Sequence, residues 1–176
     1  MASLVGSRVE RKEDKKFLTG KGRYTADINL VNQTHAIFVR SPHARAQIKK
    51  IDISKASKAP GVVAILTGQD LANDKIGGLI AGWKIVSEDG SDMKVPPHPA
   101  LATDTVNYVG DHIAVVIAET LEEAKDAAEM VKVDYKVLKA VVETESAMDS
   151  DVIHKDIPKN LCYDWLLGDR NKTKEA

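Results

Sequence analysis

Residues 108–137, YVGDHIAVVIAETLEEAKDAAEMVKVDYKV, decide the fold of this chain. Residues 113–118 form a continuous apolar run, which is typical of a strand that is covered on both faces. From Val131 to Val137, apolar and charged residues alternate, and this predicts a second strand with one face in solvent. The residues between them have a helical pattern. The stretch therefore predicts a strand, a helix and a second strand.

The helix of this stretch has a clear start. We expect the Thr120 hydroxyl to cap it and the Glu123 carboxylate to reach back to the Thr120 amide, which together form a capping box. One face carries small apolar residues at three- and four-residue spacing, so the helix can lie close to a sheet. The stretch lacks the glycine-rich turn of a nucleotide-binding βαβ unit, and we interpret it as a packing element.

Length and composition limit the class of protein. The chain has 176 residues, which suits one domain, and 43% of them are hydrophobic, which is ample for a core. The 25 Lys and Arg nearly balance the 26 Asp and Glu, so nucleic-acid binding is disfavoured. The sequence has no apolar run long enough for a membrane span and no secretory segment at its start. With Cys162 as the single cysteine, we expect a reducing, cytoplasmic setting.

A second, shorter unit of the same kind precedes the first. Residues 34–39 are rich in β-formers and predict a strand that ends at Ser41-Pro42. Residues 47–53 alternate with one slip between Ile48 and Ile51, which predicts a β-bulge. Ser54 is expected to cap a short helix over residues 55–58, and residues 62–66 predict a buried strand. Two such units predict an α/β (α+β) fold, a mixed β-sheet with a few short helices packed on it.

The remaining segments have weaker patterns. Residues 1–16 are charged and aperiodic and predict an arm or loop, and residues 19–22 predict a turn. Residues 72–99 are rich in glycine and proline. Since a structureless loop of this length is uncommon in a compact domain, either residues 79–86 pair as a strand or a partner shapes the segment. A short helical turn is expected at residues 145–148.

Candidate chemistry is sparse. The five histidines are scattered without a metal-binding pattern, Glu13 and Asp14 are interpreted as solvated surface, and Cys162 has no neighbouring base. One basic cluster, Arg40, His43 and Arg45, surrounds Ser41-Pro42. It is either a corner that binds a carboxylate, a phosphate or an acidic partner domain, or a plain basic turn between two strands. His112 is expected at the start of a strand, at the rim of the sheet.

Five segments together resemble a known family: residues 13–28 (EDKKFLTGKGRYTADI), 35–52 (HAIFVRSPHARAQIKKID), 59–71 (APGVVAILTGQDL), 99–142 (beginning PALATDTVNYVGDHI) and 160–169 (NLCYDWLLGD). In this order they resemble the N-terminal region of the large subunit of the molybdenum hydroxylases, the family of xanthine dehydrogenase, aldehyde oxidase and aerobic carbon monoxide dehydrogenase. The RSPHA and YVGD segments are most similar to the carbon monoxide dehydrogenase-like large chains.

The resemblance implies a domain plan. Residues 1–156 would form an α/β hammerhead domain, with the arm at 1–16 and a variable loop at 72–99, and residues 157–176 would lead as a linker to absent molybdopterin-binding domains. The chain itself is expected to hold no cofactor. Molybdenum with molybdopterin cytosine dinucleotide would be bound by those later domains, and iron–sulfur clusters and FAD by partner subunits or domains.

The resemblance also implies what this chain does. None of the family's catalytic residues falls on it, so the chain alone is expected to be an inactive fragment, a truncated product or a split subunit with a scaffolding and subunit-docking role. The alternative is a stand-alone binding or assembly module that has the hammerhead fold, because a fold alone does not fix a function. The substrate stays open among carbon monoxide, a purine, an aldehyde and an N-heterocycle.

Overall fold

The computed structural model describes residues 5–175. The chain forms two compact units, Met1–Gln33 and Thr34–Ala176. The first contains α1 (Asp14–Leu18) and a 3-10 turn, η1 (Thr25–Asp27). A helix thus begins inside the predicted arm, where Arg11 pairs with Asp14 across 3.0 Å. After α1 the chain turns at Gly20, which has a φ of +68° that glycine adopts readily, so the predicted turn is present.

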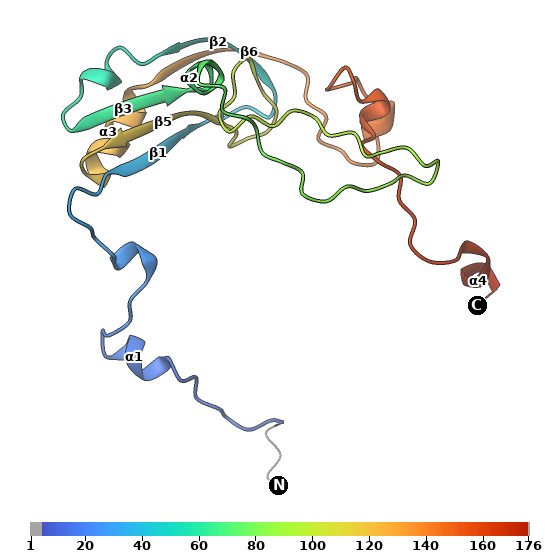
Figure 1. The fold of residues 1–176 in the computed structure, drawn as a ribbon, viewed down its shortest axis with the longest axis horizontal. Coiled ribbons are helices and arrows are strands. Elements are labelled where there is room, and N and C mark those ends of the chain that lie inside the picture. The colour runs from blue at the N-terminus through green and yellow to red at the C-terminus, as the bar shows by residue number, and fades with distance from the viewer. Residues whose placement is uncertain (1–4, 176) are drawn as a thin grey trace. The chain divides into compact units, whose positions relative to one another are not determined.

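The second unit contains two small sheets (Figure 1). Sheet A has the strand order β1 (His35–Arg40), β5 (His112–Ala118) and β3 (Val62–Thr67). Sheet B has the order β4 (Thr105–Val106), β2 (Ala46–Asp52) and β6 (Lys132–Val137). Every pair of neighbouring strands is antiparallel. The predicted fold class is confirmed, and the expectation of one mixed sheet is corrected to two antiparallel ones.

The correction has a simple topological cause. Both predicted strand–helix–strand units pass from one sheet to the other: β5 leads through α3 (Leu121–Met130) to β6, and β2 leads through the 3-10 turn η2 (Ala56–Lys58) to β3. Because each unit contributes one strand to each sheet, β3 pairs with β5 and β2 pairs with β6. A helical connection within one sheet would instead give parallel neighbours.

Most local predictions in this unit are confirmed, but the strand expected to be buried at residues 62–66 is wrong in its burial, because the residues of β3 are half-buried or exposed. At the start of α3, the Glu123 amide donates to the Thr120 hydroxyl across 3.2 Å, and Thr120 donates its amide and hydroxyl to the Glu123 carboxylate. The register of β2 against β6 shifts between Ile48 and Lys50, which is the expected bulge. The expected cap at Ser54 is wrong. Its amide and hydroxyl donate to the Asp52 carboxylate, so Ser54 closes a turn instead of starting a helix.

A hydrophobic core joins the two sheets. Ala46, Ala102, Val106 and Ile113 are fully or almost fully buried, and Ile48, Ile51, Val133 and Tyr135 pack against them. On sheet A, α3 contacts all three strands (Figure 1). It buries Ala124 and Ala127, as its small apolar stripe predicts. A further helix, α2 (Gly68–Asn73), follows β3 and has its own capping box between Thr67 and Asp70.

Residues 72–99 form a ribbon with little regular structure. Of the strand expected at residues 79–86, one isolated bridge is present, between Val86 and Asp92. The ribbon pairs with the C-terminal part of the chain, because the amides of Glu88 and Lys94 donate to the carbonyls of Asp164 and Cys162. The C-terminal part of the chain thus contributes to the conformation of this segment, and shaping by a partner stays a prediction.

Short helical turns complete the second unit: η3 (Ala147–Asp149), which lies at the expected helical turn, η4 (Pro158–Asn160) and α4 (Arg170–Glu175). Across residues 5–175, no helix has both the length and the apolar character that crossing a membrane requires.

Candidate functional site

The turn at Ser41-Pro42 is built from hydrogen bonds of the buried residue Ser41. Ser41 is 3% exposed, and its hydroxyl donates to the His43 carbonyl and accepts from the His43 amide. Its backbone also pairs with a second turn, because its amide donates to the Asp111 carbonyl and its carbonyl accepts from the Gly110 amide. The end of β1 is thereby fixed to the segment that leads into β5.

The three basic residues of the predicted corner have different surroundings. Arg40 is exposed, and its guanidinium donates to the Gly110 carbonyl across 3.2 Å. The His43 ring is half-buried, edge-on to Tyr135 with ring centres 4.8 Å apart. Burial raises the pKa of the Tyr135 phenol. His43 thus contributes to packing on sheet B, while Arg40 stays at the surface.

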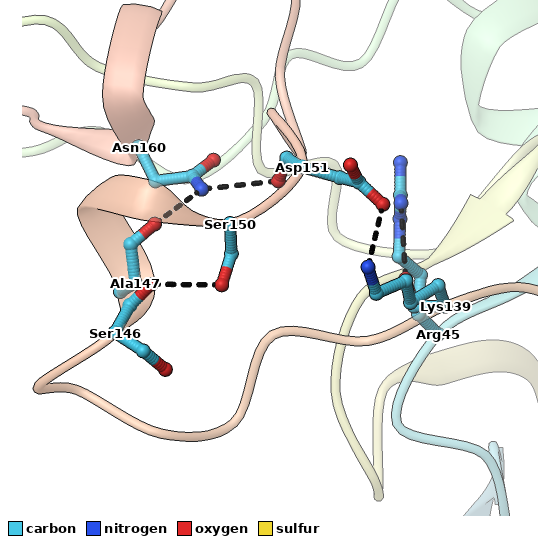
Figure 2. Close-up of polar contacts among 7 residues, drawn as sticks. All are labelled: Arg45, Lys139, Ser146, Ala147, Ser150, Asp151 and Asn160. Atoms are coloured by element: carbon cyan, nitrogen blue, oxygen red, sulfur yellow. Dashed lines mark hydrogen bonds and ion pairs between the residues drawn. The ribbon is translucent and has the colours of Figure 1, made fainter.

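Arg45 connects segments that are distant in sequence (Figure 2). One guanidinium nitrogen donates to the Lys139 carbonyl across 3.1 Å and another to the Ile153 carbonyl across 3.2 Å. Its Nε is buried and has no hydrogen-bond partner within the described chain. Since two of its donor groups are already engaged, the structure gives Arg45 a structural task. Binding of an anion by this corner stays a prediction.

Asn160 organises the segment that Arg45 holds (Figure 2). Its amide nitrogen donates to the carbonyls of Ala147 and Asp151, at 2.9 and 3.1 Å, and its side-chain oxygen accepts from the Ile153 amide at 2.8 Å. Its φ of +55° lies in the left-handed region, where asparagine is tolerated better than most residues. The sequence contained no local signal for this role beyond the residue type.

A cavity of about 340 Å³ lies between the 79–99 ribbon and residues 102–111. Its lining is mainly apolar, with Leu79 and the prolines of the ribbon, and its polar groups include Tyr108, His98 and Asp111. Burial raises the pKa of the Tyr108 phenol, the nearby Asp111 carboxylate adds to the rise, and Arg40 opposes it. His98 Nε2 lies 3.3 Å from the Tyr108 hydroxyl.

Asp111 is the polar residue of this region that sequence reasoning missed. It is 7% exposed, and its carboxylate accepts from the Asn107 amide across 2.9 Å. The adjacent Gly110 has a φ of +93°, and a glycine followed by an aspartate is the residue pair in the sequence that is typical of a turn. Asp111 thus stabilises the entry to β5.

His112 is the first residue of β5, as expected. Its ring stacks on Phe38, with centres 4.5 Å apart and planes 24° from parallel, and its Nε2 is buried without a partner among the described residues.

Metal chemistry has no visible basis in the described residues: no three His, Cys, Asp or Glu side chains gather where they would hold a metal ion. Cys162 is a free, half-buried thiol.

Comparison with known proteins places residues 19–139 in the family described as aldehyde oxidase and xanthine dehydrogenase, a/b hammerhead domain. The nicotine 6-hydroxylase large subunit of Paenarthrobacter nicotinovorans is 38% identical over 90% of this chain and 19% of its own length. The carbon monoxide dehydrogenase large chain of Afipia carboxidovorans is 34% identical over 96% of this chain and 21% of its own.

Among solved structures, the Cu,Mo-CO dehydrogenase in its carbon monoxide-reduced state is similar with a TM-score of 0.72 and 32% identity. The similarity covers 97% of this chain and 22% of that one. This chain thus spans about a fifth of the length of these three relatives.

Proposed function

Because the chain belongs to the aldehyde oxidase and xanthine dehydrogenase a/b hammerhead family, we propose that it is the N-terminal structural domain of a molybdenum-dependent oxidoreductase large subunit. Its task in that subunit is to cover the molybdopterin-binding domains and to dock partner subunits. The observation that carries this proposal is the family match over residues 19–139, combined with a span of about a fifth of the nicotine 6-hydroxylase and carbon monoxide dehydrogenase large chains.

The cofactors of this proposal lie outside the chain. Molybdenum with molybdopterin cytosine dinucleotide is held by the later domains of the large subunit, and iron–sulfur clusters and FAD by partner subunits or domains. Molybdenum is supported by the name of the similar Cu,Mo-CO dehydrogenase. The reaction is an oxidation of carbon monoxide, a purine, an aldehyde or an N-heterocycle, and we propose a cytoplasmic location.

Elemental analysis of the purified 176-residue chain tests whether molybdenum is bound outside this chain. We expect no bound molybdenum in this chain, and molybdenum in the large subunit that the same reading frame encodes. A stoichiometric amount of molybdenum in the chain alone would contradict the proposal. A stop codon directly after Ala176, with no partner gene for the remaining domains, would favour the stand-alone module.

The scaffolding task needs a separate experiment on the complete large subunit. Ile113 is fully buried in the core that joins both sheets, so Ile113→Asp places an unpaired charge there and unfolds the domain. We expect this variant to lose assembly with the iron–sulfur and flavin subunits in size-exclusion chromatography. Val63→Asp, at a position that is 59% exposed, is the matched control. Assembly that is unchanged by Ile113→Asp would refute the scaffolding task.

A further inference from the structure

The register of sheet A assigns its side chains to two faces. Ile37, Val116 and Ile65 are directly opposite one another across the three strands, so they share one face. On β5, the residues with this orientation, Ala114, Val116 and Ala118, are all fully buried. Because α3 contacts all three strands of sheet A, this is the face that it covers.

The opposite face is apolar and open. Phe38, Val115 and Leu66 form one row across the strands, and Ala36, Ile117 and Ala64 form the next. Phe38 is 43% exposed and Leu66 38%, while Val115 and Ile117 are half-buried although they lie on the central strand. These six residues are the outer face of sheet A. Within the described part of the second unit, residues 34–175, no element buries them as α3 buries the other face.

The size of the outer face limits what can cover it. Three strands about 4.8 Å apart and about six residues of 3.3 Å long give an area of roughly 300 Å². A stable dimer interface buries about 800 Å² on each partner. An interface between two domains of one chain can be stable with about 300 Å² on each side, or about 600 Å² in total, because the link between the domains raises their effective concentration. The area therefore favours a domain of the same chain over a second copy.

A polar rim lies beside the apolar rows. Arg40 follows Phe38 on β1 and has the same orientation, and no carboxylate pairs with it among the described residues. His112 stacks on Phe38 at this end of the face. An apolar centre with an arginine at its edge is the usual composition of a specific interface.

We propose that the outer face of sheet A packs against the molybdopterin-binding region of the same large subunit, through a flat apolar surface that places an acidic side chain opposite Arg40. This inference rests on the proposed function. It is supported by the length of the relatives, of which about four-fifths lies outside the matched region.

Cysteine labelling of the complete large subunit tests the proposal. Phe38→Cys is introduced together with Cys162→Ser, and the rate of alkylation is compared between the 176-residue chain and the complete subunit. We expect the rate to fall about tenfold or more in the complete subunit, because the face is then covered. Leu66→Cys, on the other edge strand, provides a second position should Phe38→Cys fold poorly. Lys125→Cys, at an exposed position of α3, is the control and keeps its rate.

The outcomes separate this inference from the proposed function. Equal labelling of Phe38→Cys and Leu66→Cys in both proteins, in a subunit that still binds molybdenum and its partners, overturns the inference and leaves the function intact. Protection that already exists in the 176-residue chain and grows with its concentration assigns the face to a second copy and also overturns it. The charge contact of Arg40 is checked with Arg40→Glu, which should repel the acidic side chain opposite it, and we expect this change to increase labelling of Phe38→Cys in the complete subunit.

Discussion

Replacing Arg45 by lysine separates its structural task from anion binding. The Arg45 guanidinium spans the carbonyls of Lys139 and Ile153, at 3.1 and 3.2 Å. Lysine keeps the positive charge, but its single ammonium group lacks the planar fork that reaches two acceptors. The substitution should therefore loosen the segment after β6 while it preserves the electrostatics of the corner.

The expected magnitude follows from the surroundings of the two bonds. A hydrogen bond from a charged donor contributes about 1.5–3 kcal/mol. The bond to Lys139 is exposed and water replaces it easily, whereas the bond to Ile153 is partly buried. We therefore expect the free energy of local opening to fall by about 2 kcal/mol, which corresponds to roughly 30-fold faster exchange of the protected amides.

Hydrogen exchange read by mass spectrometry measures this effect. Peptides within residues 138–160 should exchange faster in Arg45→Lys, while peptides from β5 should keep their rates. Arg40→Lys is the matched control, since Arg40 is exposed and makes one bond to a carbonyl. Unchanged exchange of residues 138–160 in Arg45→Lys would refute the structural task. Phosphate affinity retained in Arg45→Lys and lost in Arg45→Met would support the predicted anion corner.

Three further predictions concern stability. Ile113→Ala should lower the free energy of unfolding by about 2–5 kcal/mol in urea denaturation, and Ile113→Val by about 0.5–1.5 kcal/mol, because the side chain is fully buried; equal effects of both would contradict this. Thr120→Ala should cost about 1 kcal/mol by loss of the α3 cap, and an unchanged urea midpoint would count against it. Hydrogen bonds from Ser54 lower the pKa of Asp52 to about 2. Because this pKa is below its unfolded value, the contribution of Asp52 is present above about pH 4 and lost as the pH falls toward 2. Asp52→Asn should remove that part of the pH dependence, and a profile identical to that of the unchanged chain would refute it.

The sequence predicted what depends on neighbours along the chain. The capping box of α3 needs Thr120 and Glu123 at three-residue spacing, and the bulge of β2 needs the slip after Ile48. Both arise from local geometry, so a pattern is sufficient to find them. The T-x-x-D box at Thr67 and Asp70 has the same kind of signal, and α2 was nonetheless missed because its helix is a turn and a half long.

Contacts between residues that are distant along the chain could not be predicted from the sequence patterns. The bonds of Arg45 join residues 94 and 108 positions apart, and nothing in its neighbourhood distinguishes it from an ordinary basic turn. The same limit applied to the sheets. The patterns of β5 and β6 predicted two strands correctly, but a pattern does not state which strands pair, so two antiparallel sheets were expected as one mixed sheet.

The two strands that α3 connects, β5 and β6, differ in how well their sequence patterns match their exposure. In β6 the charged residues Lys132, Asp134 and Lys136 are exposed, as an alternating strand requires. In β5 the continuous apolar run predicts cover on both faces, but Val115 and Ile117 are half-buried beside the fully buried Val116. A strand that keeps branched apolar side chains on an open face is poorly explained by this chain alone. The pattern is explained when a further domain covers the outer face of sheet A, which is what the labelling of Phe38→Cys measures.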